Sequence, residues 1–139
     1  SESTMSYRGD PEYQRRGGGW IGVDLDGTLA HSNCAWKNGE IGPPVPLMVA
    51  RVRKWLAEGE DVHIVTARAD LAAHTAAEIT RTLHNIENWC VKHLGQVLPV
   101  RCSKDPRMLA LYDDRAIQVE RDTGRLIGAD DRAFNHADL

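Results

Sequence analysis

Short apolar runs alternate along the chain with longer segments of helical periodicity. The apolar runs predict buried strands at residues 20–23, 61–66, 97–102 and 108–112. Segments 49–59 and 71–94 carry apolar side chains at helical spacing and predict amphipathic helices. Strands that alternate with helices favour a parallel sheet, because parallel neighbours need crossover connections. The pattern therefore predicts an α/β fold: an open, mostly parallel, Rossmann-like sheet with helices on both faces.

The remaining segments flank or connect this predicted core. Residues 1–19 are polar and end in three glycines, which predicts a flexible N-terminal arm before a single domain at residues 20–127. Residues 29–47 lack a helical period, so we expect only a small flap after the first strand and no cap domain. Asp122-Thr123-Gly124 predicts a hairpin within residues 118–127, and residues 128–139 are expected to form a tail.

The composition is that of an ordinary globular protein. A chain of 139 residues with 42% hydrophobic positions can bury a core without a disulfide or zinc staple, and its three cysteines form no C-x-x-C pair. The net charge of −3 gives no general footprint for nucleic acid. No apolar run is long enough for a membrane span and the first residues do not resemble a secretory signal, so we expect a cytoplasmic protein.

Acidic residues follow two of the predicted strands. Asp24 and Asp26 come after the first strand, and Asp113 and Asp114 come after the fourth. In open α/β sheets ligands bind beyond the carboxyl ends of the strands, so these side chains are expected at one edge. Clustered carboxylates repel one another, and oxygen ligands of this kind suit Mg²⁺. The sequence therefore predicts a magnesium site, although a single acid at a strand end is usually only solvated.

A threonine and a lysine follow the other two strands. Thr66 ends the second strand and Lys104 comes after the third. Each has an ordinary interpretation by itself, since threonine at a strand end commonly caps a helix and most lysines lie on the surface. Together with a metal and a carboxylate nucleophile, a hydroxyl and an ammonium group form a site that can neutralise the oxygens of a phosphoryl group.

These residues, in this order, resemble the four motifs of the haloacid dehalogenase (HAD) superfamily of phosphatases. The matching segments are Asp24-Leu-Asp-Gly-Thr, His63-Ile-Val-Thr66, Lys104 and Tyr112-Asp113-Asp114. The resemblance covers residues 20–115 and is to a minimal, capless type of the superfamily. It implies a Mg²⁺-dependent phosphomonoester hydrolase that works through an aspartyl-phosphate intermediate.

The resemblance also implies a role for each matching residue. Asp24 corresponds to the nucleophile, and Asp26 corresponds to the acid that protonates the leaving oxygen and then deprotonates the attacking water. Thr66 and Lys104 would bind a phosphate oxygen, and Lys104 would also face the nucleophile.

The same resemblance implies a set of metal ligands. These are the Asp24 carboxylate, the backbone carbonyl of Asp26 and an acid of the last motif, with Asp114 favoured as the direct ligand and Asp113 as a partner through water. Backbone N–H groups of the turn at residues 25–28, together with Thr28, would form a nest for phosphate.

Two features depart from the usual pattern of the superfamily. Lys104 lies only nine residues before Asp113, where many relatives have an intervening helix, and Lys92 is the weaker substitute for it. The flap at residues 29–47 leaves no room for a cap domain. An uncapped site favours a large substrate or a lid supplied by a partner subunit, so a homodimer is one hypothesis.

Two short runs resemble the phosphatase part of polynucleotide kinase-phosphatases, which act on 3′-phosphate ends. These are Thr66-Ala-Arg68 and Asp113-Asp-Arg115. A nucleic-acid end is therefore one substrate hypothesis, with Arg68 expected to bind phosphate. Further arginines, Arg101, Arg107 and Arg115, would then surround the site, although each by itself is equally explained as a solvated surface residue. Trp36 would stack on a base or else hold the flap.

Other functions fit parts of the pattern. A phosphatase of a small phosphorylated metabolite needs the same residues, and a non-catalytic binding module of the same fold is a further alternative. Receiver domains of two-component signalling also place acids, threonine and lysine at strand ends. They carry the acidic pair on the first strand, whereas here the pair comes last, so the order of the motifs favours the phosphatase.

Overall fold

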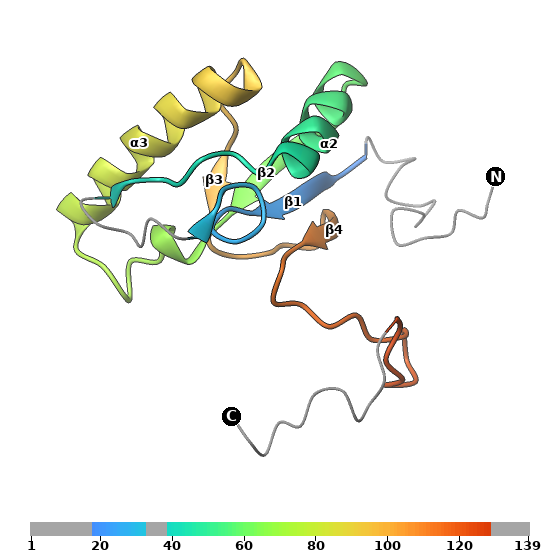
Figure 1. The fold of residues 1–139 in the computed structure, drawn as a ribbon. Coiled ribbons are helices and arrows are strands. Elements are labelled where there is room, and N and C mark those ends of the chain that lie inside the picture. The colour runs from blue at the N-terminus through green and yellow to red at the C-terminus, as the bar shows by residue number, and fades with distance from the viewer. Residues whose placement is uncertain (1–17, 33–38, 129–139) are drawn as a thin grey trace.

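The computed structural model describes residues 18–32 and 39–128 and shows the predicted α/β fold, with an open sheet of four parallel strands (Figure 1). The order across the sheet is β3-β2-β1-β4. The strands are β1 (Trp20–Asp24), β2 (Asp61–Val65), β3 (Val100–Arg101) and β4 (Met108–Tyr112). The helices are α2 (Pro46–Ala57), the short 3₁₀ helix η5 (Ala67–Ala69) and α3 (Ala76–Leu94).

Both long helices begin at different residues from those predicted. Helix α2 begins at Pro46, because proline is tolerated in the first turn, where its missing N–H has no partner to lose. Helix α3 begins after Thr75, whose hydroxyl accepts from the Glu78 N–H while the Glu78 carboxylate accepts from the Thr75 N–H. This capping box fixes the start of α3 five residues after the predicted one. The helix ends at Leu94, the predicted residue, and Gly95 follows it in the left-handed conformation.

Strand β3 is shorter than the predicted strand at residues 97–102. Only Val100 and Arg101 pair with β2. Pro99 precedes them and accepts a bond from the Ile64 N–H, but proline has no N–H with which to continue the ladder. The third strand therefore pairs with β2 through these two residues, at an edge of the described sheet.

Helices α2 and α3 lie on the same face of the sheet, which differs from the predicted arrangement on both faces. They contact each other and share one apolar core with β1 and β2. The chain moves in one direction through the sheet, from β1 to β2 and then to β3. Two right-handed crossovers in the same direction must place both helices on one side. The link from β3 to β4 is too short for a third helix.

The apolar core lies between the sheet and the two helices. Alternate residues of β1 and β2 face the helices and are almost fully buried, namely Ile21, Val23, Val62 and Ile64. They pack against Val52 of α2 and against Ile86, Trp89 and Cys90 of α3. The core therefore holds in place the carboxyl ends of β1 and β2.

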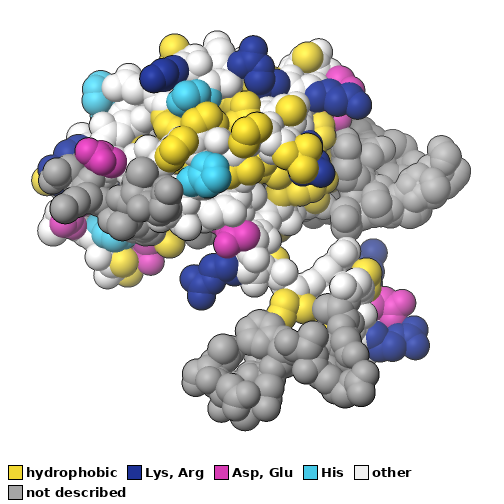
Figure 2. All heavy atoms as spheres, viewed as in Figure 1, with side chains coloured by type: hydrophobic (Ala, Val, Ile, Leu, Met, Phe, Trp, Pro, Cys, Tyr) yellow, Lys and Arg dark blue, Asp and Glu magenta, His cyan; other side chains and the backbone are white. Residues whose placement is uncertain are grey.

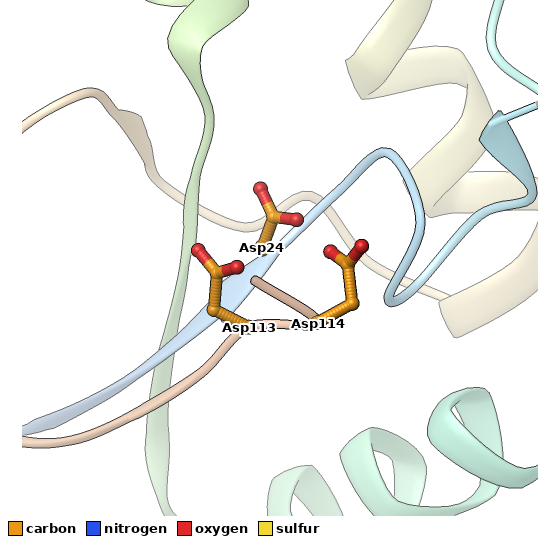
Figure 3. A group of neighbouring side chains, drawn as sticks. All are labelled: Asp24, Asp113 and Asp114. Atoms are coloured by element: carbon orange, nitrogen blue, oxygen red, sulfur yellow. The ribbon is translucent and has the colours of Figure 1, made fainter. Parts of the chain in front are cut away.

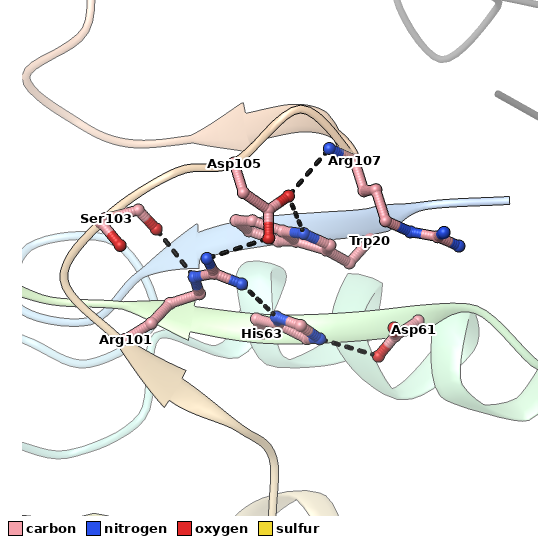
Figure 4. A network of polar contacts seen from close by, with 7 residues as sticks. All are labelled: Trp20, Asp61, His63, Arg101, Ser103, Asp105 and Arg107. Atoms are coloured by element: carbon pink, nitrogen blue, oxygen red, sulfur yellow. Dashed lines mark hydrogen bonds and ion pairs between the residues drawn. The ribbon is translucent and has the colours of Figure 1, made fainter.

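The opposite face of the sheet is covered by the link between β3 and β4 (Figure 4). The Trp20 ring stacks on the His63 ring, and the Arg101 guanidinium lies 4.3 Å from the centre of the Trp20 ring. Asp105 accepts from Trp20 Nε1 at 2.9 Å, from Arg101 at 3.1 Å and from the Arg107 N–H at 2.8 Å. These contacts tie the link across the sheet in place of a helix.

The two ends of the predicted flap lie side by side. His31 donates its N–H to the Pro43 carbonyl and Val45 donates to the Leu29 carbonyl, which closes the base of the loop. Gly42 then accepts from Trp89 Nε1 at 2.9 Å, so this part of the flap lies against α3. The tip of the flap, with Trp36, lies outside the described residues, as do residues 1–17 and 129–139.

A space-filling view from the same side shows hydrophobic side chains gathered on this face of the molecule (Figure 2). A groove of about 530 Å³ lies between the flap and α3. Its lining comes from the flap and from α3: Glu40, Ile41, Pro43, Pro44, Asn85, Asn88, Trp89, Lys92 and His93. None of the predicted site residues except Lys92, the weaker candidate, lines this groove.

The predicted hairpin at residues 118–127 is confirmed. Val119 and Leu126 form an antiparallel bridge, and the Glu120 N–H donates to the Arg125 carbonyl at 2.7 Å. Asp122 and Gly124 take positive φ angles at the turn, a conformation that aspartate and glycine tolerate. Within the residues that the structure describes, no helix is long and apolar enough to cross a membrane.

The shared core predicts where α3 tolerates substitution. Ile86 is fully buried against the sheet, whereas Val91 on the same helix is about half exposed. Ile86→Ala should lower the free energy of unfolding by about 2–5 kcal/mol, because it leaves a cavity. Val91→Ala should change it by less than about 0.5 kcal/mol. Urea denaturation measures both, and equal losses would contradict the placement of α3.

Candidate functional site

Three aspartates converge at the carboxyl ends of two neighbouring strands (Figure 3). Asp24 is the last residue of β1, and Asp113 and Asp114 directly follow β4, which is the neighbour of β1. One carboxylate oxygen from each of the three lies within 4.8 Å of the others. The sequence placed these acids at one edge, and the parallel pairing of β1 with β4 brings them into one group.

The turn after β1 holds the Asp114 side chain in place. The Thr28 hydroxyl lies 3.0 Å from Asp114 Oδ1 and 3.3 Å from Asp24 Oδ2, and it accepts from the Asp114 N–H at 2.9 Å. Gly27 has φ +90°, and a Cβ at this position would lie 2.7 Å from an Asp114 carboxylate oxygen. The Gly-Thr pair of the motif therefore makes room for Asp114 and binds it.

The electrostatics of the group favour a cation. Burial and the neighbouring Asp113 and Asp114 carboxylates raise the pKa of Asp24 from 3.8 to about 7, and the Thr28 hydroxyl opposes this rise. The three carboxylates lie close enough to repel one another, and water screens this repulsion only in part. The donor set consists of oxygen atoms alone and fits a hard divalent cation such as Mg²⁺. Asp24, Asp113 and Asp114 are thus the residues that would hold it.

Asp26 does not join this carboxylate group. Its two oxygens accept from Arg68 Nε and from a terminal guanidinium nitrogen, each at 2.7 Å, in a bidentate ion pair. The Arg68 side chain is 2% exposed and that of Asp26 is 15% exposed. The structure pairs Arg68, which we expected to bind phosphate, with the predicted acid and base, and binding of phosphate by Arg68 stays a prediction. The contact of the Asp26 carbonyl with a metal stays a prediction.

Thr66 takes the ordinary role that the sequence left open. It is buried, and its hydroxyl accepts from the Arg68 N–H at 3.2 Å, so it caps η5. The cap fixes the start of η5 and thereby the direction in which Arg68 leaves the backbone toward Asp26. Binding of a phosphate oxygen by Thr66 stays a prediction.

Lys104 is exposed on the link between β3 and β4. Its neighbours on the link are held to the sheet, because Arg101 donates to the Ser103 carbonyl at 2.7 Å and Asp105 accepts from Trp20 and Arg101. Within the described part of the chain, no hydrogen bond or ion pair joins Lys104 to Asp24 or Thr66. The structure thus places Lys104 on an anchored link and leaves its predicted role untested.

Other predicted contributors have structural partners. In the turn at residues 25–28, the Gly27 and Thr28 N–H groups donate to the Ala30 and Leu25 carbonyls, so these two are not available for the predicted nest. The Arg101 guanidinium lies over the Trp20 ring. An Arg107 terminal nitrogen donates to the Gly18 carbonyl at 3.0 Å. Arg68, Arg101 and Arg107 thus each have a partner within the protein, and the predicted ring of arginines around the site stays a prediction.

Sequence reasoning missed two contacts that shape this site. One is the Arg68–Asp26 ion pair, which joins residues 42 positions apart. The other is the Thr28 bridge to Asp114, across 86 positions. Both need tertiary proximity, and only the Thr-x-Arg and Asp-x-Asp-Gly-Thr patterns hinted at them.

Comparisons of the chain with family models, curated proteins and solved structures find no match.

The raised pKa of Asp24 predicts a pH-dependent stability of the metal-free protein. A folded-state pKa of about 7, against 3.8 for an unperturbed aspartate, contributes stability that is fully present below about pH 4 and is lost as pH rises to about 7. The melting temperature in EDTA should therefore fall between about pH 4 and pH 7, and Asp24→Asn should flatten this slope. Asp122→Asn, at an exposed turn, is the control and should retain it. A slope unchanged in Asp24→Asn would refute this electrostatic account.

Proposed function

We propose that this protein is a Mg²⁺-dependent phosphomonoester hydrolase that works through an aspartyl-phosphate on Asp24. The observation that carries the proposal is the convergence of Asp24 with Asp113 and Asp114 at adjacent strand ends, with carboxylate oxygens within 4.8 Å. These acids occupy the first and last motifs of the pattern that resembles the HAD phosphatases. An acidic group alone is not specific, and it is the order of the motifs around it that favours phosphoryl transfer.

Asp24 suits the role of nucleophile. A carboxylate oxygen of Asp24 attacks phosphorus, and the bond from phosphorus to the leaving oxygen of the ester breaks. In the second step a water oxygen attacks the same phosphorus, which releases inorganic phosphate and regenerates the carboxylate. The raised pKa of Asp24 means that a nearby cation is needed to keep this carboxylate ionised at neutral pH. When bound, Mg²⁺ neutralises the charge of the carboxylates and of the phosphoryl oxygens.

Asp26 suits the role of acid and base, under the control of Arg68. It would give a proton to the leaving oxygen and then take one from the attacking water. In the described structure both of its oxygens accept from Arg68, at 2.7 Å each. The pair orients the carboxylate, and one of the two hydrogen bonds must open so that Asp26 can take up from solvent the proton that it then gives to the leaving oxygen. Arg68 is then a positioning residue, and its binding of phosphate stays a prediction.

Thr66 and Lys104 complete the proposed phosphate site. The hydroxyl of Thr66 already accepts from the Arg68 N–H, and it retains a proton to donate to a phosphate oxygen. Lys104 is an exposed cation on an anchored link and would add positive charge when substrate binds. A peripheral phosphoryl oxygen would therefore meet donors from two further strand ends.

Hydrolysis of an aryl phosphate tests the nucleophile. The parent protein should release phosphate when Mg²⁺ is added and should stop when EDTA removes it. Asp24→Asn keeps the shape of the side chain but cannot form the acyl phosphate, so kcat should fall at least about 10³-fold. The exposed control Asp122→Asn should retain the parent rate. Equal rates for the parent and Asp24→Asn would contradict the proposal, and so would activity that is the same with Mg²⁺ and in EDTA.

The substrate is proposed to be a phosphate at a nucleotide or nucleic-acid end, on the resemblance to the polynucleotide phosphatases. The absence of a cap domain among the described residues leaves the aspartates accessible to a large substrate. The alternative is a small phosphorylated metabolite. The charges near the acids do not decide between them, because Arg68 and Arg101 already have partners in the protein.

A substrate panel distinguishes these alternatives. Oligonucleotides phosphorylated at the 3′ or 5′ end, mononucleotides and sugar phosphates are compared by kcat/KM under the same conditions. The nucleic-acid hypothesis predicts a preference for oligonucleotides of at least about tenfold, a difference of about 1.4 kcal/mol in transition-state binding. Equal or higher kcat/KM for mononucleotides or sugar phosphates would reject it and favour the metabolite.

A further inference from the structure

A cluster of hydrogen bonds centred on Asp105 holds the link of residues 102–107 against the face of the sheet opposite the helices (Figure 4). Asp105 Oδ1 accepts from the Arg107 N–H at 2.8 Å and from Trp20 Nε1 at 2.9 Å, and Oδ2 accepts from Arg101 at 3.1 Å. The Arg107 N–H, followed by the Trp20 and Arg101 donors, holds the pKa of Asp105 below its usual range. We call these three contacts the Asp105 clasp.

Lys104 lies between two points at which the link is held. On one side the Ser103 carbonyl accepts from Arg101 Nε at 2.7 Å, and on the other side the clasp begins at Asp105. The link contains no helix, so these contacts are what fix the backbone around Lys104. The Lys104 side chain itself is exposed, which leaves its ammonium group accessible.

The clasp also keeps the Asp105 carboxylate away from the Lys104 ammonium. The two residues are adjacent in the chain and carry opposite charges. A carboxylate offers about four acceptor sites, and the clasp occupies three of them with donors from the sheet and the link. Within the described part of the chain, no ion pair joins Asp105 to Lys104. The lysine therefore stays available to an external anion.

The register of the sheet places this part of the link near the acidic site. Arg101 pairs with Val65, and Val65 pairs with Asp24, so the three residues form one row across the carboxyl ends of the strands. Neighbouring strands lie about 4.8 Å apart, so the row spans about 10 Å. From Arg101 the chain must cross β2 and β1 to reach β4, and Lys104 lies on this crossing. Its long, flexible stem extends its reach further.

We propose that Asp105 is a positioning residue, which fixes the link through the clasp so that the Lys104 ammonium faces the phosphoryl group at Asp24. The proposal rests on the proposed hydrolase function and adds a residue that touches neither substrate nor metal. A link that is ordered before substrate binds does not have to be ordered during the reaction, which lowers the entropic cost. The clasp also explains how a lysine only nine residues before Asp113 is held without an intervening helix.

A double-mutant cycle on aryl phosphate hydrolysis tests this role. Lys104→Gln removes a cation that stabilises the transferring phosphoryl group and should lower kcat/KM about 10²-fold. Asp105→Ala removes all three bonds of the clasp and should lower kcat/KM at least about tenfold in the parent chain. In the Lys104→Gln background the same change should cost less than about twofold, because no ammonium group is left to position.

A conservative variant and a matched control accompany the cycle. In Asp105→Asn the amide oxygen can keep the Trp20 and Arg107 bonds, while an amide nitrogen replaces the oxygen that faces Arg101. Its kcat/KM should lie between those of the parent and Asp105→Ala. Asp61→Ala removes another exposed carboxylate on the same face, one that bonds to no residue of the link, and should keep the parent rate.

Two measurements without turnover separate this proposal from the proposed function. The Trp20 N–H donates to the Arg107 carbonyl at 3.0 Å, so its hydrogen exchange in the metal-free protein reports on the closure of the link. Asp105→Ala should speed this exchange at least about tenfold. Calorimetric titration with inorganic phosphate in Mg²⁺ repeats the cycle: Asp105→Ala should weaken binding in the parent chain and leave it unchanged in the Lys104→Gln background.

The outcomes distinguish a positioning role from a merely structural one. Equal losses of kcat/KM from Asp105→Ala in the two backgrounds would overturn the proposal, and so would an unchanged exchange rate of the Trp20 N–H. A parent chain without hydrolysis would reject the proposed function. Equal losses of phosphate affinity in the two backgrounds would then overturn the role of Asp105 as well.

Discussion

The parallel pairing of β1 with β4 is the constraint on which the site depends. The two strands are separated by most of the domain along the chain, yet they are neighbours in the sheet, with Val23 paired to Tyr112. Parallel strands end at the same edge, so this pairing places the acid that ends β1 beside the two acids that follow β4. If β4 joined the other edge of the sheet, the same three aspartates would be present but would not lie together.

Bringing three carboxylates together costs electrostatic free energy, and the local structure shows how it is accommodated. The pKa of Asp24 rises to about 7, so the metal-free protein keeps a proton there up to about that pH. Gly27 leaves room for the Asp114 carboxylate, and Thr28 hydrogen-bonds it. Asp26, the fourth acid of the motifs, is compensated separately by the buried Arg68. The arrangement suits a site that a divalent cation completes.

The two faces of the sheet serve different purposes. On one face α2 and α3 bury the apolar core that fixes the ends of β1 and β2. On the other face the link between β3 and β4 lies over Trp20 and His63 and is bound through Arg101 and Asp105 (Figure 4). Because the link takes the place of a third helix, β4 follows it directly and remains an edge strand. The acids that follow β4 are therefore close to an edge of the described sheet.

The sequence by itself determined the fold class, the four strands and the strand ends at which the acids lie, because apolar periodicity and turn residues are local signals. It also predicted Met108–Tyr112 with the bounds that the structure shows. It did not determine the start of α3, which depends on the hydroxyl–carboxylate exchange at Thr75, or the single helical face, which follows from the direction of the crossovers. The partners of Asp26 and Asp114 were decided only by tertiary structure. Arg68 and Thr28 reach them across 42 and 86 positions of the chain. A local sequence pattern cannot show which distant side chains the packing of the sheet brings into contact.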